Sequence, residues 1–391
     1  MQLTEIQKSL REQGLDGWLF FDHHERDALA YRILGFKPAR HVTRRWYYLI
    51  PASGDPRGLV HRIESGMLDE LPGIKTPYSS WQLQRSGLQD LLRGCHKIAM
   101  QYSPECAVPY VSMVDAGTLE LVRAMGVEVV TSADLVQFFE ARWTEAQLAA
   151  HLEAGRRVDE VRRAAFAEIG SRLGRNQPVT EWDIKNFILD AFTHAGLFTD
   201  HGPIVAVNAN ASNPHYEPTA GDHLPIQKGD NVLIDLWAKL NEDDSVYYDI
   251  TWTGYCGPAV PPEVARVFDV VAGARDAAIA RVKQAVSGGE VLAGYQVDDA
   301  CRGYIAAAGL GEYFVHRTGH SIGRDVHGSG ANMDNLETHD TRCLIPRTCF
   351  SIEPGVYLPS FGIRSEVNMY VGEHEAIVTG EVQRAPVLVL P

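Results

Sequence analysis

Four acidic residues interrupt apolar segments of strand length, and this pattern limits the possible folds and functions of the chain more than any other feature. Asp235 stands in "VLIDLW", Asp249 in "YYDITW", Glu353 in "FSIEPG" and Glu366 in "GIRSEVNMYV". A carboxylate buried without a partner is costly, although any one of them could face solvent on an alternating strand. On four successive predicted strands, a cation would offset their repulsion and their desolvation together.

Three histidines, His316, His320 and His327, fall within twelve residues of the segment "VHRTGHSIGRDVHG". His316 and His320 are four residues apart, which would align them on a helix, but Gly319 and Gly323 argue against a regular helix. The spacing alone leaves three roles open: metal ligand, catalytic acid or base, and polar residue of a glycine-rich loop. His320 comes just before the last two acidic segments and can join them.

Four carboxylates and one imidazole form an oxygen-rich set that suits Mn, Co, Zn or Fe(II) better than a thiolate-seeking metal. The set exceeds the needs of one tetrahedral Zn and provides enough oxygens for two ions about 3.5–4 Å apart. A water held between two such ions would lose a proton near neutral pH and act as a nucleophile. The residues therefore predict a dinuclear hydrolase and leave its substrate open.

The chain of 391 residues is too long for one typical domain, and its pattern of predicted helices and strands changes along its length. Residues 1–143 alternate short helices and strands, which predicts an α/β N-terminal domain. Residues 144–391 open with long amphipathic helices and continue with strands, two further helices and more strands. We expect an α+β catalytic domain there, with Thr180 as the N-cap of one helix and Gly196 at its end.

Charge and cysteine usage exclude several classes of partner. The net charge of −14 argues against nucleic acid. No apolar run approaches the ~20 residues that span a bilayer, and the first residues lack a signal-peptide core, so we expect no membrane partner. The six cysteines are scattered without CxxC spacing and predict free thiols in a reducing compartment, hence a cytoplasmic protein.

One short basic patch, "FKPARHVTRRW", stands out in this acidic chain. It is either a solvated loop or a cationic contribution to the site of an anionic substrate. If the protein is a homodimer, Arg40, Arg44 and Arg45 of one chain could meet the carboxylate of a substrate in the other and confine it to dipeptides.

The segments "VLID", "YYDITWTGY", "GHSIGRDVH", "FSIEPGVY" and "GIRSE", in this order, resemble the pita-bread metallopeptidases, which include methionine aminopeptidase, aminopeptidase P and prolidase. The resemblance covers roughly residues 145–391, and the N-terminal part resembles the extra domain of aminopeptidase P, prolidase and creatinase. Within the family, the chain looks most like the prolidases (Xaa-Pro dipeptidases). This implies a pita-bread catalytic domain, a homodimer, hydrolysis of Xaa-Pro dipeptides, and two divalent metal ions, Mn with Co or Zn as alternatives.

The resemblance also implies roles for single residues. It assigns five metal ligands: Asp235, Asp249, His320, Glu353 and Glu366. Asp249 and Glu366 would bridge the two ions, Asp235 would serve one ion, and His320 and Glu353 the other. Glu353 would double as the general base for the bridging water.

Five further side chains match the substrate side of the family's site: His215, His327, His316, Tyr357 and Arg364. His215 and His327 would donate hydrogen bonds to the scissile carbonyl, and His316 would line the proline pocket near Tyr357. Arg364 suits a bidentate grip on the carboxylate of a dipeptide. The alternatives are structural roles. His316 and His327 could satisfy backbone groups of the loop, Tyr357 could be a core aromatic, and Arg364 could pair with an acidic ligand.

Two departures from the family pattern affect these assignments. Asp235 and Asp249 are fourteen residues apart, more than is usual, so Asp243 and Asp244 in the added turn are rival ligands. We reject them because neither lies in an apolar strand. Trp252 stands where relatives commonly carry arginine, which removes a cation near the metals and could alter the pocket wall.

Two other functions compete with dipeptide hydrolysis. Aminopeptidase P removes the N-terminal residue from longer X-Pro peptides. Creatinase-like and non-enzymatic binding relatives share the fold but lack the metal set, and the presence of all five predicted ligands disfavours this second alternative.

Overall fold

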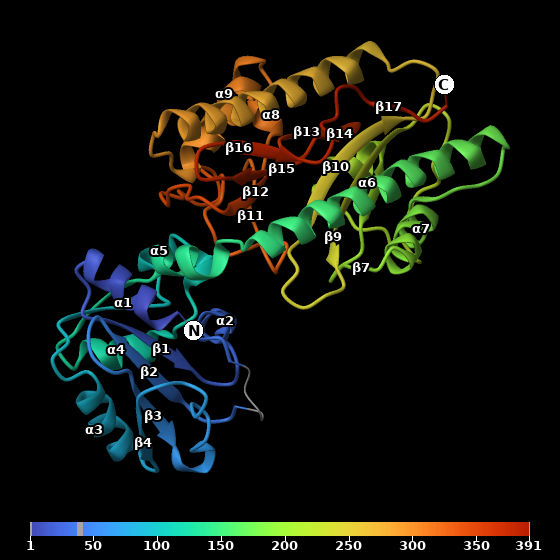
Figure 1. The fold of residues 1–391 in the computed structure, drawn as a ribbon. Helices are drawn as coiled ribbons and strands as arrows, with labels where there is room; N and C mark the ends of the chain where they lie inside the picture. Colours follow the sequence, from blue (N-terminus) through green and yellow to red (C-terminus); the bar gives the residue numbers. More distant parts are fainter. Residues whose placement is uncertain (1, 37–41, 391) are drawn as a thin grey trace. The chain divides into compact units, whose positions relative to one another are not determined.

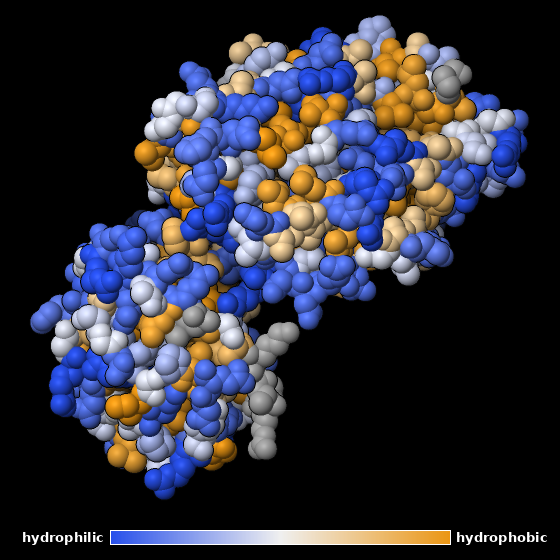
Figure 2. Space-filling model, in the orientation of Figure 1, coloured by the Kyte–Doolittle hydropathy of each residue, from blue (hydrophilic) through white to orange (hydrophobic). Residues whose placement is uncertain are grey.

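The computed structural model describes residues 2–36 and 42–390, and the chain divides into two compact units, Met1–Glu140 and Ala141–Pro391 (Figure 1). In the described part of the chain, no helix combines the length and apolar character needed to cross a bilayer. The six cysteines are free thiols. On the face seen in Figure 2, hydrophilic residues dominate and apolar residues are scattered among them, as is normal for a folded domain.

The N-terminal unit is built on a six-stranded sheet with the order β4-β3-β2-β1-β5-β6. β2 runs antiparallel to both of its neighbours, while β1, β5 and β6 are mutually parallel, as are β3 and β4. The strands are β1 Gly17–Asp22, β2 Trp46–Pro51, β3 Arg57–His61, β4 Ile74–Tyr78, β5 Lys97–Met100 and β6 Glu128–Thr131. The helices are α1 Leu3–Glu12, α2 Ala28–Leu34, α3 Trp81–Leu91, α4 Ala116–Arg123 and α5 Ala133–Val136.

Helices cover both faces of this sheet, which explains why β1 is apolar along its whole length. Trp18 and Phe20 point to the core that α1 and α2 complete, whereas Leu19 and Phe21 point to the core that α3 and α4 complete. The N-terminal unit is therefore a three-layer α/β domain.

The C-terminal unit contains two larger sheets and one hairpin. The first sheet has the order β17-β10-β9-β7, with β8 also paired to β9, and the second has the order β11-β12-β15-β16. The strands of the C-terminal unit are β7 Leu197–Phe198, β8 Ile204–Val207, β9 Asn231–Leu240, β10 Tyr248–Tyr255, β11 Ser321–Ile322, β12 Thr348–Ile352, β13 Gly355–Leu358, β14 Phe361–Arg364, β15 Val367–Val371, β16 Ala376–Thr379 and β17 Val387–Leu388. Its helices are α6 Glu145–Gly174, α7 Glu181–His194, α8 Pro262–Gly288 and α9 Gly294–Ala307.

Helices α6 and α7 pack on one face of the first sheet, and α6 crosses β9 and β10 in Figure 1. Alternate residues of β9, from Val232 to Ala238, enter this core. The predicted cap is confirmed, because the Thr180 hydroxyl accepts a hydrogen bond from the Asp183 backbone N–H at 3.1 Å. Gly196, with φ of 67°, follows the last turn of α7, as predicted. Because the even-numbered positions of β9 face the helices, Asp235 faces the opposite side of the sheet.

Helix α6 closely approaches the start of β10 and the residue that precedes it. A Cβ on Gly155 would lie 2.7 Å from ring carbons of Tyr248, so glycine is required for this contact. His151, one turn earlier, is fully buried, and its ring nitrogens lie 2.7 Å from the Tyr247 carbonyl oxygen and 2.7 Å from Thr379 Oγ1. Burial lowers the pKa of His151 to about 4.

Trp252 also belongs to this helix-covered face, and the prediction that it shapes the wall of the metal site is wrong. Its ring packs against the core under α6, and the Arg162 guanidinium carbon lies 3.4 Å from the ring centroid. Because successive residues of a strand face opposite sides, Trp252 points away from the face that carries Asp249 and Thr251. The cation next to position 252 is therefore Arg162, and it lies on the face of the sheet opposite to Asp249.

Helices α8 and α9 complete the core of the second sheet and of the β13–β14 hairpin. The apolar segments that carry Glu353 and Glu366 are each divided between two strands. "TCFSIEPGVYL" forms β12 and β13, separated at Glu353 and Pro354, and "GIRSEVNMYVG" forms the end of β14 and β15, separated at Ser365 and Glu366. Pro354 cannot donate a ladder hydrogen bond, so the first break follows from local chemistry.

Candidate metal centre

Three of the predicted metal ligands meet inside the C-terminal unit. One ligand atom each from Asp249, His320 and Glu366 lie within 4.8 Å of one another, and all three residues are buried. Asp249 comes from β10, His320 directly precedes β11, and Glu366 lies in the break between β14 and β15. Distant parts of the chain thus bring two carboxylates and one imidazole to the same place.

Hydrogen bonds between β10 and the chain around β15 bring the two carboxylates together. The Glu366 backbone N–H donates to the Thr251 carbonyl oxygen at 3.1 Å. The Asp249 backbone N–H donates to Asn368 Oδ1 at 3.0 Å, and Asn368 Nδ2 donates back to the Asp249 carbonyl oxygen. This two-way amide contact places Asp249 and Glu366 side by side.

Glu353 lies beside the same group. His320 Nε2 is 3.4 Å from Glu353 Oε1 and 3.5 Å from Asp249 Oδ2. Ser351 Oγ accepts a hydrogen bond from the His320 backbone N–H at 2.9 Å and donates one to Glu353 Oε1 at 3.0 Å. A Cβ on Gly319 would lie 1.9 Å from the Ser351 carbonyl oxygen, so only glycine lets His320 come this close to β12.

The charges of this cluster are poorly compensated by the protein. Burial, followed by repulsion from neighbouring carboxylates, raises the pKa values of Asp249 and Glu366 well above the ordinary range. Among the described residues, Asp249 Oδ1 and Glu366 Oε1 have no hydrogen-bond partner. Buried polar atoms without a partner are rare. Two such oxygens, on carboxylates that share a buried cluster with an imidazole, fit a divalent cation.

Asp235 is held differently from the other four predicted ligands. It lies on β9 directly opposite Thr251 of β10, and its Oδ2 accepts a hydrogen bond from Arg364 Nη2. Arg364 thus pairs with one of the predicted acidic ligands, as the alternative structural role for this arginine requires. The role of Asp235 as a ligand stays a prediction.

A chain of three side chains extends from this ion pair. Arg364 Nη1 donates to the Tyr357 hydroxyl at 3.1 Å, and His316 Nε2 lies 2.6 Å from the same hydroxyl. Arg364 Nε also donates to Thr251 Oγ1 at 2.9 Å. Burial, with the charge of Arg364 adding to it, lowers the pKa of His316 to about 3. His316 is thus neutral, and it contacts the same hydroxyl that the Asp235-paired Arg364 contacts.

The two histidines predicted to act on the scissile carbonyl are both exposed. The His327 ring stands edge-on to His320, with ring centroids 4.3 Å apart. Repulsion from His320 is the main cause that lowers the pKa of His327, and His215 is near enough to contribute. The backbone N–H of His215 donates to Asn213 Oδ1 at 3.1 Å.

Two sets of predicted alternatives lie elsewhere. Asp243 and Asp244 are exposed, and Asp244 Oδ1 accepts a hydrogen bond from Arg324 Nε at 3.0 Å, in agreement with our rejection of these residues. Arg44 and Arg45 belong to the N-terminal unit, and Arg40 lies outside the described residues. Their proposed contact with a substrate stays a prediction.

The sequence analysis missed three buried polar residues that support the ligands: Thr251, Ser351 and Asn368. Thr251 Oγ1 donates a hydrogen bond to Glu366 Oε2 at 2.9 Å. Each of the three stands two positions from a predicted ligand, on the same face of a strand or its extension. A polar residue two positions from an acidic one inside an apolar segment was therefore the available signal.

Comparisons with known proteins identify the family. The model of metallopeptidase family M24 matches residues 149–373. The chain belongs to this family. A Mycoplasma pneumoniae protein that is named an Xaa-Pro aminopeptidase is 34% identical to this chain over 211 residues. The matched part covers 53% of this chain and 55% of that protein. The Xaa-Pro dipeptidase of Lactobacillus helveticus is 35% identical over 165 residues, 42% of this chain and 40% of that protein.

The family membership confirms the predicted fold class. The dipeptidase PepE of Mycobacterium ulcerans has a similar structure with a TM-score of 0.75 and 26% identity, over 100% of this chain and 97% of that one. An α/β N-terminal domain is thus followed by a pita-bread catalytic domain. The chain spans about half the length of the curated relatives it matches. Family M24 also implies divalent metal ions, which the buried cluster fits.

Proposed function

We propose that this M24 protein is an Xaa-Pro dipeptidase that uses two divalent metal ions. The observation that carries the proposal is the buried cluster of Asp249, His320 and Glu366, in which each carboxylate has one oxygen without a partner among the described residues. A protein gains nothing in stability from such a cluster unless a cation offsets the repulsion. The resemblance of the sequence to prolidases and the name of the Lactobacillus helveticus relative support the choice of substrate.

We assign the metal ions to five ligands: Asp235, Asp249, His320, Glu353 and Glu366. By the resemblance to the family, Asp249 and Glu366 would be shared by the two ions, and each has one oxygen without a hydrogen-bond partner among the described residues. Mn is the expected metal, with Co or Zn as alternatives. When bound, the ions would lower the pKa of a water and polarise the scissile carbonyl.

The protein's own groups would move the proton and hold the carbonyl. Glu353, which is less buried than the other carboxylates of the cluster, would take the proton of the attacking water and return it to the proline nitrogen. Ser351 orients Glu353 through the hydrogen bond to its Oε1. His327 and His215, both exposed, would donate hydrogen bonds to the carbonyl oxygen as charge develops there.

The chain formed by His316, Tyr357 and Arg364 would bind the proline end of the substrate. Arg364 already donates to Asp235, and its Nη1 reaches the Tyr357 hydroxyl and, at 3.5 Å, the Pro214 carbonyl oxygen. A substrate carboxylate would compete for this Nη1 group. The preference for a dipeptide would follow from this one cation at the end of the site.

The test is hydrolysis of an Xaa-Pro dipeptide by protein treated with a chelator and then supplied with Mn, Co or Zn. We expect activity only with metal, and loss of activity in Glu366→Gln but not in Glu263→Gln, an exposed glutamate in the first turn of α8. A protein that binds no metal and stays inactive would favour the non-hydrolytic alternative.

The second candidate function is that of aminopeptidase P, which the name of the Mycoplasma pneumoniae relative supports. A longer X-Pro peptide is the discriminating substrate. Rapid cleavage of the longer peptide, with no cleavage of the dipeptide, would replace dipeptidase activity with this function.

The catalytic domain in this proposal comprises residues 144–391, and residues 1–143 form the N-terminal domain. We also propose a homodimer, which light scattering would test. The free cysteines suit a cytoplasmic location, because thiols persist in a reducing compartment.

A further inference from the structure

A cavity of about 860 Å³ lies within the N-terminal unit, at the ends of three of its strands. β1, β3 and β4 end at this cavity, and helices α3 and α4 begin there. In open α/β sheets, ligands bind in the crevice outside the carboxyl ends of the strands. The volume is in the range of small-molecule sites. None of the predicted metal ligands lines the cavity.

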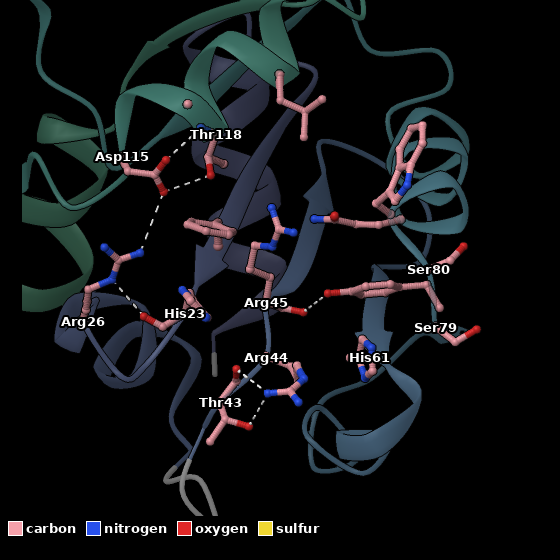
Figure 3. A pocket seen from close by; sticks show the side chains of 16 residues that line it. His23, Arg26, Thr43, Arg44, Arg45, His61, Ser79, Ser80, Asp115 and Thr118 are labelled. Carbon is pink, nitrogen blue, oxygen red and sulfur yellow. Dashed lines mark hydrogen bonds and ion pairs between the residues drawn. The ribbon is translucent and has the colours of Figure 1, made fainter.

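Three arginines and one carboxylate line the cavity: Arg26, Arg44, Arg45 and Asp115. Arg26 Nη2 lies 3.8 Å from Asp115 Oδ2. The Glu64 carboxylate accepts from the Arg44 backbone N–H at 3.1 Å, but no carboxylate in the described part of the chain forms an ion pair with the guanidinium of Arg44 or Arg45. Figure 3 shows Arg45 in the middle of the group, with His23 and Arg26 to one side. The excess of positive charge contrasts with the net charge of −14 of the whole chain.

The start of helix α3 adds to this positive potential. Its N-cap is the neutral residue Ser80, whose hydroxyl accepts from the Leu83 backbone N–H at 3.2 Å, and its first turn contains no acidic residue. The start of α4 is different, because the carboxylate of Asp115 caps it and accepts from the Thr118 backbone N–H at 2.9 Å. An unneutralised helix N-terminus attracts anions, so α3 and the arginines favour the same kind of ligand.

Aromatic rings form the other part of the wall. Phe21, Tyr78 and Trp81 line the cavity, together with His61, whose ring stands perpendicular to Tyr78 at a centroid distance of 5.0 Å. Trp81 is 68% exposed, a large apolar side chain in contact with water. A planar ring of a ligand would cover part of this surface and stack on it.

We propose that this cavity binds a small organic anion that carries a planar ring next to a phosphate or carboxylate group. The anionic group lies among Arg44, Arg45 and the start of α3, and the ring lies against the aromatic wall. The cavity lies within the N-terminal unit, and the proposal does not depend on the proposed function.

The experiment is a titration of the full-length protein, followed by calorimetry, with four probes: phenyl phosphate, benzoate, the neutral analogue benzamide, and inorganic phosphate. We expect saturable binding of at least one ring-bearing anion, about tenfold tighter than that of benzamide or inorganic phosphate. The comparison of phenyl phosphate with benzoate decides which anionic group the site takes. Binding should weaken with increasing salt.

Matched variants locate the binding. Arg45→Gln should weaken the binding of the anion about tenfold. Arg85→Gln, which changes an exposed arginine of α3 that does not line the cavity, should leave binding unchanged. Melting temperatures of both variants check that they fold. The proposal is overturned if neither ring-bearing anion binds in a saturable way, if benzamide binds as tightly, or if the two variants bind alike.

Discussion

Replacing Asp249 by asparagine should have opposite effects on stability with and without metal. The carboxylates of Asp249 and Glu366 offer ligand atoms within 4.8 Å of each other. Two unit charges at that distance repel by about 3 kcal/mol at an effective dielectric constant near 20. Burial first, and repulsion between the carboxylates second, raise the pKa values of both groups in the metal-free protein. We therefore expect Asp249→Asn to stabilise the metal-free protein by about 1–2 kcal/mol.

Few contacts are lost, because Asp249 Oδ1 has no hydrogen-bond partner among the described residues and the contact of Oδ2 with His320 Nε2, at 3.5 Å, is long. A change of this size shifts the melting temperature of a domain of this length by roughly 2–8 °C. With metal present the sign reverses. Metal at about a hundred times its dissociation constant stabilises the wild type by about 2.7 kcal/mol, and the variant should lose most of this effect.

The assay is thermal unfolding of both proteins, with chelator and with added Mn. Asp298→Asn is the matched control, because Asp298 is equally buried but satisfied: it accepts from the Thr318 backbone N–H at 2.9 Å and pairs with Arg302 Nε at 2.8 Å. This control should lose stability by about 3 kcal/mol in both conditions. If Asp249→Asn destabilises the metal-free protein as Asp298→Asn does, the reasoning that the cluster requires a cation is refuted.

Three further predictions concern other parts of the C-terminal unit. Tyr357→Phe removes the hydroxyl that links a histidine to an arginine, and it should raise KM for the dipeptide about tenfold, with a smaller change in kcat; an unchanged KM would argue against a substrate role. Gly155→Ala should destabilise the protein by about 1–3 kcal/mol, because a Cβ there meets a tyrosine ring at 2.7 Å, whereas Gly174→Ala, with nothing within 4 Å, should not; equal melting temperatures would contradict the close packing. His151 has a pKa of about 4 in the folded protein against 6.5 when unfolded. The free energy of unfolding should therefore be at its full value above pH 6.5 and fall by up to about 3 kcal/mol as the pH is lowered to 4. Denaturant unfolding of His151→Asn should show a smaller decline over the same pH range.

The local parts of this structure could be predicted from the sequence because their causes are local. The cap at Thr180 and the glycine after α7 depend on neighbouring residues, and both are found in the structure. Asp235 and Asp249 could be recognised because a carboxylate between aliphatic residues of a strand is costly wherever the strand lies. The position of Trp252 was misjudged, although strand alternation alone places it on the opposite face to Asp249.

The sequence by itself determined which charged and polar groups need partners in the folded protein: acidic groups in apolar segments, an imidazole in a glycine-containing loop, and arginines in an acidic chain. Only the tertiary structure decided how they are paired. Arg364 meets Asp235 across 129 positions of the chain, and Glu366 meets Thr251 across 115. It also brought Arg44, Arg45 and the start of α3 to one cavity. Such contacts depend on which strands become neighbours, and that choice is made by the packing of whole helices and sheets rather than by any short stretch of sequence.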